Sequence, residues 1–250
     1  MPGDSHDAAQ RRRQASSFGA AAAAYERGRP PYPAEAVDWL LPQGALRVLD
    51  LGAGTGKLTR QLRDRGLDVV AVEPSEGMRE QLARAVPGAA VYAGSAEQIP
   101  LPDHSVDAVL VAQAWHWVDR GRAVPEVARA LVPGGRLGLV WNIRDEREDW
   151  VAELGRILHD PGDHHRGDRG IVGPPFGPVE HRDVEWTHQL SRDELIDLAA
   201  SRSYVITMTD RERAAVLAGV AHLADRLLGP SGEGELALPY VTECYRADLS

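Results

Sequence analysis

Residues 48–62 read VLDLGAGTGKLTRQL, an apolar run that leads through a glycine-rich turn into a segment with helical spacing. Gly52, Gly54 and Gly56 are spaced two apart, and Asp50 stands just before them. Such a turn lets a ligand approach the backbone closely, and the helix that follows exposes its first N–H groups. The stretch therefore predicts a strand, a turn and a helix that together bind a nucleotide-like ligand.

Strand-like and helix-like segments alternate around this turn. The apolar runs VVAV, AVLVA and LGLVW are typical of strands buried on both faces of a sheet. This alternation predicts a doubly wound α/β fold with a parallel sheet. The expected strands are 47–51, 68–72, 90–93, 106–112 and 136–141, and the expected helices are 34–41, 56–65, 75–86 (capped by Ser75) and 120–131, with a turn at 133–135.

The pattern loosens after residue 142. Ser191 and Glu194 have the spacing of a capping box at a helix start, and Pro239 is expected to keep the last strand away from the centre of a sheet. Residues 1–17 are expected to form a disordered tail. The other expected elements are helices at 18–29, 149–159, 191–202 and 210–228, strands at 180–190 and 235–246, and a mobile loop at 160–180.

Composition narrows the possible partners. The 250 residues carry a formal net charge of −9, which argues against a general nucleic-acid-binding role. Cys244 is the single cysteine, so no intramolecular disulfide forms and a reducing, cytoplasmic setting is expected. The N-terminal residues lack the apolar run of a signal peptide, and no stretch is long and apolar enough to span a membrane.

Two familiar nucleotide-binding motifs do not fit the glycine turn. A triphosphate-binding loop would place glycine at Leu51 and a serine or threonine at Leu58. A dinucleotide-binding turn would place a small residue at Lys57, and Asp50 would repel a pyrophosphate. S-Adenosylmethionine fits better, because Asp50 can help hold its ammonium group and Glu73, at the end of the second strand, can accept the two ribose hydroxyls.

At this point the chain resembles a known family. VLDLGAGTGKLT, AVEPSEGM, GSAEQIPLPDHSVDAVLVAQAWHW and LVPGGRLGLVWNIRD are similar, in order, to the motifs of class I S-adenosylmethionine-dependent methyltransferases. FGAAAAAYERGRPPYP and AQAWHW further resemble the small-molecule subgroup that contains trans-aconitate methyltransferase. The resemblance implies a Rossmann-like seven-stranded, mostly parallel sheet with helices on both faces and an antiparallel last strand.

The resemblance also implies a domain plan and a set of cofactor contacts. A single domain is expected over 18–250, with a cofactor-binding core at 46–145 and a cap carrying acceptor-binding elements at 146–235. Arg29 is expected to pair the methionine carboxylate of the cofactor. The implied cofactor-binding residues are Tyr25, Arg29, Asp50, Gly52, Ala53, Gly54, Glu73, Pro74, Met78, Ser95, Ala96, Glu97 and Gln113.

Methyl transfer is an in-line displacement, so the protein must align the acceptor and exclude water, and a base is needed only when the acceptor must lose a proton. His116 is the candidate catalytic residue, as a base, as an orienting group or only as packing between Trp115 and Trp117. Those tryptophans either line the acceptor pocket or fill the core. Arg144 either binds an acceptor carboxylate or forms a surface ion pair, and Arg202 and Tyr204 are the remaining candidates for acceptor binding.

The sequence leaves the acceptor group and the activity open. The expected acceptor is a small molecule, and the sequence does not decide whether it bears a carboxylate, a hydroxyl or an amine. A non-methylating S-adenosylmethionine-binding sensor or interaction module would carry the same cofactor motif. The polar cluster of residues 159–168 is expected to form a lid and not a metal site, because its spacing matches no ordinary zinc motif.

Overall fold

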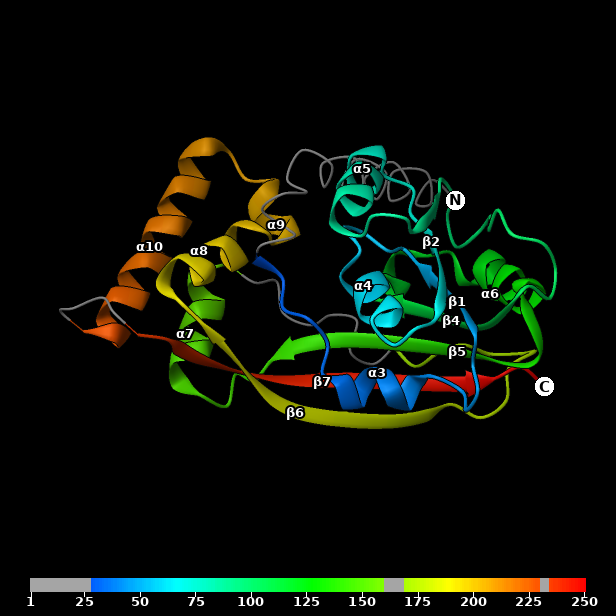
Figure 1. Cartoon of the computed structure of the whole chain (residues 1–250). Helices are drawn as coiled ribbons and strands as arrows, with labels where there is room; N and C mark the ends of the chain where they lie inside the picture. The colour runs from blue at the N-terminus through cyan, green and yellow to red at the C-terminus, as the bar shows by residue number, and fades with distance from the viewer. Residues whose placement is uncertain (1–27, 160–168, 230–233) are drawn as a thin grey trace, which may run out of the picture. The chain divides into compact units, whose positions relative to one another are not determined.

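The computed structural model describes residues 28–159, 169–229 and 234–250 (Figure 1). These residues fall into two compact units. The larger unit contains residues 31–142, 169–184 and 242–250, and the smaller unit contains 28–30, 143–159, 185–229 and 234–241. The expected N-terminal tail, most of the helix at 18–29 and part of the loop at 160–180 lie outside the described residues.

The strands form one seven-stranded, mostly parallel sheet in the order β3-β2-β1-β4-β5-β7-β6. β1 pairs in parallel with β2 and with β4, so the glycine turn leaves the sheet from an interior strand. In Figure 1 the arrows of β5 and β7 point in opposite directions, which confirms the expected antiparallel last strand. The strands are β1 (Arg47–Leu51), β2 (Asp68–Val72), β3 (Ala90–Tyr92), β4 (Val106–Ala112), β5 (Leu131–Arg144), β6 (Glu180–Leu190) and β7 (Leu236–Asp248).

The helices of the larger unit alternate with its strands as the sequence predicts. The N-cap of α4 is Gly56, with φ of 92°, where a Cβ would lie 2.8 Å from Leu82 Cγ, so only glycine is accommodated without a shift. Leu58 and Leu62 of α4 are buried in an apolar core together with residues of β1, β2 and β4. These helices are α3 (Ala34–Leu40), α4 (Lys57–Arg63), α5 (Glu76–Ala85) and α6 (Arg120–Ala130), with a short 3-10 helix η1 (Trp115–Trp117).

The smaller unit is largely helical. Capping boxes start two of its helices: Ser191 with Glu194 at α8, as the sequence predicts, and Thr209 with Glu212 at α10. The apolar faces of these helices share a buried cluster with Leu236, Leu238 and Tyr240 of β7. The helices are α7 (Asp149–Ile157), α8 (Arg192–Ala200), α9 (Ser203–Ile206) and α10 (Asp210–Leu228).

Several sequence expectations about local structure are wrong. The Ser75 side chain makes no capping hydrogen bond to α5, although its backbone N–H donates to Glu73 Oε1 at 2.9 Å. The expected turn at 133–135 is absorbed into β5: Val106 pairs with Leu131 and Ala108 with Arg136, so the intervening residues form a bulge. The helix after Ser191 ends at Ala200, and α9 follows as a separate short helix.

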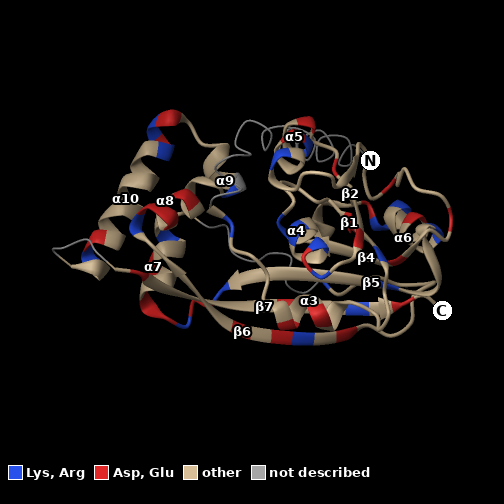
Figure 2. Ribbon diagram, viewed as in Figure 1, with Lys and Arg blue, Asp and Glu red and all other residues tan. Residues whose placement is uncertain are grey.

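Pro239 does not keep the last strand at the edge of the sheet, since β7 lies between β5 and β6. Proline lacks only the N–H, and its carbonyl still accepts a hydrogen bond from the Asp145 N–H at 3.0 Å. The edge position belongs instead to β6, whose sequence EHRDVEWTHQL is mostly exposed and includes both acidic and basic side chains (Figure 2). Charged side chains on an edge strand discourage pairing with other chains.

Candidate functional site

The carboxyl ends of β1, β2 and β4 lie at one edge of the sheet, because these strands are parallel neighbours. The glycine turn after β1 is tied to the end of β2, since the N–H groups of Gly52 and Ala53 donate to the Val72 carbonyl at 2.8 and 3.2 Å. Glu73 follows β2 directly, and Gln113 follows β4. Residues that are far apart in the chain therefore meet at this edge, which we call the strand-end site.

Glu73 organises the strand-end site. Its Oε2 accepts the Gly54 N–H and its Oε1 accepts the Ser75 N–H, both at 2.9 Å. The side chain is only 7% exposed, and burial raises the pKa of this carboxyl above its usual value. A carboxylate has about four acceptor positions, so capacity remains for hydroxyl donors after two backbone N–H groups have been accepted.

Asp50 is a buried acid with one unsatisfied oxygen. Thr59 Oγ1 donates to Asp50 Oδ2 at 2.5 Å, whereas Asp50 Oδ1 has no hydrogen-bond partner among the described residues. Burial, with a further contribution from the negative charge of Glu73, raises the pKa of Asp50 to about 7. A fully buried acceptor without a donor is costly, so this oxygen suits a ligand that brings a positively charged N–H group.

The glycine turn permits close approach of a ligand to the backbone. Gly52 and Gly54 have φ of 74° and 56°, in the left-handed region that favours glycine. A Cβ at Gly52 would lie only 3.0 Å from the Ala114 Cβ. Together with the two acids, this backbone fits an adenosyl ligand that carries an ammonium group and a ribose diol and no phosphate.

Five other expected cofactor residues, Pro74, Met78, Ser95, Ala96 and Glu97, belong to the larger unit. Met78 and Ala96 are buried, and Pro74 is exposed with its carbonyl accepting from Arg79 Nη1 at 2.7 Å. Glu97 Oε1 accepts the Asp119 N–H at 2.8 Å, so this carboxylate already has a structural contact at the start of α6. The Ser95 and Gln98 backbones form a bridge, and Tyr25 lies outside the described residues. Their contacts with a cofactor stay predictions.

The segment after β4 holds His116 in a defined orientation. The Trp141 indole N–H donates to His116 Nδ1 at 3.3 Å, and the His116 ring packs against Trp117 with centroids 4.7 Å apart. Since an indole N–H is only a donor, His116 Nδ1 must be the acceptor, and the neutral ring carries its proton on Nε2. Trp115 has no exposed surface, whereas Trp117 is 38% exposed. Gln113 precedes this segment with an unusual φ of 58°.

Sequence reasoning missed the residues that support Trp141. The Arg169 guanidinium lies 5.4 Å from the Trp141 ring centroid, and Arg169 Nη1 pairs with Glu243 Oε2 at 2.6 Å, with both side chains buried. Tyr245 packs edge-on against Trp141 and donates its hydroxyl to Glu243 at 3.3 Å. No short motif connects these residues, because the partners are far apart in the chain and meet only in the folded larger unit.

Three arginines that sequence reasoning considered separately belong to the smaller unit. Arg144 is 7% exposed, and the neighbouring Asp145, one of three acids considered for a surface ion pair with it, pairs with Arg147. Arg29 Nη2 donates to the carbonyl of Ser201 at 3.3 Å, immediately before Arg202. Burial, followed by the positive charges of Arg144 and Arg29, lowers the pKa of Arg202 to about 10. Tyr204 and Tyr240 also interact electrostatically with Arg202.

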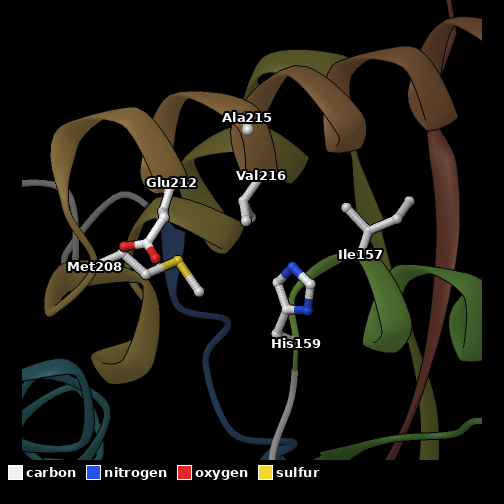
Figure 3. Close-up of a pocket in the computed structure, with 6 residues that line it drawn as sticks. All are labelled: Ile157, His159, Met208, Glu212, Ala215 and Val216. Atoms are coloured by element: carbon white, nitrogen blue, oxygen red, sulfur yellow. The ribbon is translucent and has the colours of Figure 1, made fainter.

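A separate hollow of about 470 Å³ lies in the smaller unit (Figure 3). Its walls are mostly apolar, and His159 and Glu212 contribute the polar side chains. His159 is the first residue of the polar cluster at 159–168 and the only one of that cluster within the described residues. Its lining residues are Ile157, His159, Met208, Glu212, Ala215 and Val216.

Within the described ranges, no helix is both long enough and apolar enough to cross a bilayer. The strand-end site combines two features. A buried acid lies beside a glycine turn, and a second acid follows the next strand.

Known proteins match both the sequence and the fold. A methyltransferase domain family matches residues 49–139, which include the glycine turn and Glu73. An uncharacterized methyltransferase of Mycobacterium tuberculosis (strain ATCC 25618 / H37Rv) is 58% identical over 240 residues, 96% of this chain and 98% of its own. A malonyl-[acyl-carrier protein] O-methyltransferase of Methylococcus capsulatus is 38% identical over 144 residues, 52% of each chain.

A solved structure has the same fold. A putative type II methyltransferase from Anaeromyxobacter dehalogenans superposes with a TM-score of 0.70 and 27% identity, covering 88% of this chain and 98% of that one. The similarity therefore extends well beyond the matched domain, in sequence as in fold. This near-full-length similarity shows that the chain belongs to the methyltransferase family.

Proposed function

We propose that this methyltransferase uses S-adenosylmethionine and transfers its methyl group to a small organic molecule. The observation that carries the cofactor assignment is the pair of buried acids at the strand-end site, Asp50 and Glu73. Asp50 Oδ1 supplies an acceptor for the cofactor ammonium, and Glu73 supplies acceptors for the ribose hydroxyls. When bound, the cofactor supplies an electrophilic methyl group on a good leaving group.

The glycine turn disfavours a phosphate-bearing cofactor. Buried Asp50, just before the turn, would repel a pyrophosphate, and Lys57 occupies the position that a dinucleotide-binding turn reserves for a small residue. The net charge of −9 likewise supports a small acceptor over a nucleic acid. A relative over about half the chain is named an O-methyltransferase, so we favour oxygen as the acceptor atom.

His116 serves in this proposal as an orienting group. Its Nδ1 accepts the Trp141 N–H, so the neutral ring presents an N–H and no lone pair at Nε2. Such a group holds an acceptor oxygen in line with the methyl group but does not remove a proton. The reaction then depends on alignment and on exclusion of water, which are large effects in displacement reactions.

We expect cofactor affinity to depend on pH through Asp50. The cofactor ammonium needs the ionised carboxylate, whereas the carboxyl has a pKa of about 7 in the unliganded protein. Binding of S-adenosylhomocysteine should therefore weaken as pH falls below 7, by up to about tenfold per pH unit. Titration calorimetry between about pH 5.5 and about pH 8.5 measures this slope. Asp50→Asn should bind weakly with no such slope, and an unchanged slope in that variant would exclude Asp50 as its source.

The raised pKa of Asp50 affects the stability of the unliganded protein in the opposite direction. As pH rises, cofactor affinity should increase, whereas the free energy of unfolding of the unliganded protein should decrease. Because the folded-state pKa of Asp50 is raised above its unfolded value, burial of the ionised form is unfavourable. The contribution of Asp50 to stability is therefore most favourable below the unfolded pKa and declines as pH rises through about 7.

Methyl transfer itself is tested with tritium-labelled S-adenosylmethionine and an ultrafiltered small-molecule extract of mycobacterial cells, because a mycobacterial relative is 58% identical. We expect label to move from the cofactor to small molecules only when active protein is present, and Glu73→Gln should abolish this transfer. Tight binding of S-adenosylmethionine without any transfer would favour the alternative of a binding module.

A further inference from the structure

The segment after β4 is held by the strand beside it. We name the residues from Gln113 to His116 the β4 exit segment, because they lead away from the carboxyl end of β4. The N–H of Gln113 donates to the Val140 carbonyl of β5 at 2.9 Å, and the Gln113 side chain donates from Nε2 to the Asn142 carbonyl at 3.2 Å. Between them, the Trp141 indole N–H donates to His116 Nδ1 at 3.3 Å. Three consecutive residues of β5 therefore bind both ends of the segment.

The β4 exit segment starts in an unfavourable backbone conformation. Gln113 has a φ of 58°, in the left-handed region that residues other than glycine seldom adopt. Such a conformation persists only where the surrounding structure enforces it, and it is concentrated at functional sites. The two hydrogen bonds from Gln113 to β5 supply such enforcement. The direction in which the chain continues toward His116 is therefore set by β5.

The β5 side chains at this place are themselves fixed within the larger unit. Trp141 is 2% exposed, and the Tyr245 ring of β7 packs edge-on against it with centroids 5.9 Å apart. Asn142 donates from Nδ2 to the Pro31 carbonyl at 2.9 Å and accepts the Thr242 hydroxyl at 2.6 Å. The hydrogen bonds of β5 to the β4 exit segment thus come from groups whose positions are already determined.

A buried tryptophan usually serves packing, and the partner of its single N–H shows whether a second role is added. A backbone carbonyl is a sufficient partner, as Trp115 illustrates by donating to the Ile171 carbonyl at 3.4 Å. Trp141 instead donates to a ring nitrogen of His116, the candidate catalytic residue. Because an imidazole nitrogen accepts only when it carries no proton, this contact selects one tautomer of the ring. Core packing alone does not account for that selection.

We propose that Trp141 is a positioning residue for methyl transfer and acts through His116, by fixing both the rotation and the tautomer of its ring. The inference rests on the proposed function, in which His116 orients the acceptor, and extends it to a residue whose own contact is with His116. The carbonyl of Asn142 and the strained backbone of Gln113 hold the base of the segment in which that ring lies.

The tautomer decides what the His116 ring offers to a ligand. With Nδ1 accepting from Trp141, the neutral ring carries its proton on Nε2 and acts there as a donor. Without the indole N–H, both tautomers become populated and the ring can rotate about its χ2 bond. Only part of the molecules would then hold an acceptor oxygen in line with the methyl group. Because displacement reactions depend strongly on alignment, transfer should slow while the cofactor binds as before.

Nitrogen NMR of the unliganded protein reads the tautomer directly. Protein with isotopically labelled histidine nitrogens is measured at about pH 8.5, where an ordinary imidazole with a pKa of about 6.5 is neutral. His116→Gln removes the His116 signals and so assigns them among the nine histidines. We expect the wild type to carry the proton on Nε2 alone, and Trp141→Phe, which keeps an aromatic ring but has no N–H, to show protons on both nitrogens. Trp39→Phe, which changes a tryptophan of α3 that packs on Arg246, is the matched control and should give the wild-type spectrum.

A double-mutant cycle separates positioning from packing. In the label-transfer assay with the small-molecule extract, Trp141→Phe should lower the initial rate by about tenfold, the loss expected for one hydrogen bond together with poorer alignment. Its affinity for S-adenosylhomocysteine should stay that of the wild type, and Trp39→Phe should keep the full rate. In His116→Gln the amide group donates without tautomers, so adding Trp141→Phe to that variant should cause no further loss. An equal loss in both backgrounds would show that Trp141 serves packing only and would overturn the proposal.

The positioning role and the proposed function fail on different results. If the wild type transfers no label, the proposed function is contradicted, while the spectrum of the unliganded protein still tests the contact of Trp141 with His116. A proton on Nδ1 in the wild type, or a Trp141→Phe spectrum identical to that of the wild type, would overturn the positioning role and leave methyl transfer intact. The first of these results needs no variant, so the test holds even where Trp141→Phe does not fold.

Discussion

Glu73→Gln is expected to weaken binding of S-adenosylhomocysteine by on the order of 100-fold, the largest effect on the cofactor that we predict for one substitution. The carboxylate accepts the N–H groups of Gly54 and Ser75, and both bonds are charge-assisted. A glutamine amide presents N–H donors to one of these N–H groups, so that bond is lost, together with an acceptor for the ribose. The substitution should therefore weaken the hydrogen bonds through which one side chain connects the glycine turn to the start of α5.

Titration calorimetry compares this variant with Glu76→Gln, which changes an exposed glutamate three positions further along. Glu76→Gln should bind as the wild type does. Wild-type affinity in Glu73→Gln, with the fold intact by circular dichroism, would show that Glu73 does not contact the cofactor.

The largest effect on stability is expected for Glu243→Ala, at about 3–5 kcal/mol of the free energy of unfolding. Glu243 and Arg169 are 5% and 6% exposed and lie 2.6 Å apart, so the substitution leaves the Arg169 charge buried without its carboxylate. Because Arg169 packs on Trp141, tryptophan fluorescence should also change. Denaturant unfolding measures the loss.

The matched control is Glu80→Ala, which removes an exposed ion pair with Arg84 within α5. It should cost less than about 1 kcal/mol, as is usual for surface pairs. A small loss in Glu243→Ala, similar to that of the control, would mean that the buried pair contributes little. The double replacement Arg169→Met with Glu243→Leu should recover part of the lost stability.

The sequence predicts the elements whose signals are local. The apolar run before the glycine turn and the run VVAV predict β1 and β2 with their observed ends, and the strand at 180–190 and the helix at 210–228 are likewise confirmed. The capping box at Ser191 is confirmed. It is predictable from sequence because both partners lie within one helical turn. Strand order and cap contacts depend on the rest of the fold, which is why the expectations for Pro239 and Ser75 are wrong.

The strand-end site is predictable for the same reason, since each strand delivers its acid directly to one edge of the sheet. The three arginines of the smaller unit are different. Arg29, Arg144 and Arg202 are separated by more of the chain than any short motif covers, and an arginine in sequence does not reveal whether its partner is a carboxylate of the protein or a ligand. Only the folded smaller unit shows that their positive charges act on one another.

The central claim is that the strand-end site binds an adenosyl cofactor without phosphate, and parallel calorimetric titrations of the wild type with S-adenosylmethionine, S-adenosylhomocysteine and NADH test it most directly. We predict binding of the two adenosyl ligands at micromolar concentrations and no binding of NADH, because buried Asp50 would repel its pyrophosphate and Lys57 stands where a dinucleotide-binding turn needs a small residue. Binding of NADH without binding of either adenosyl ligand would contradict the claim.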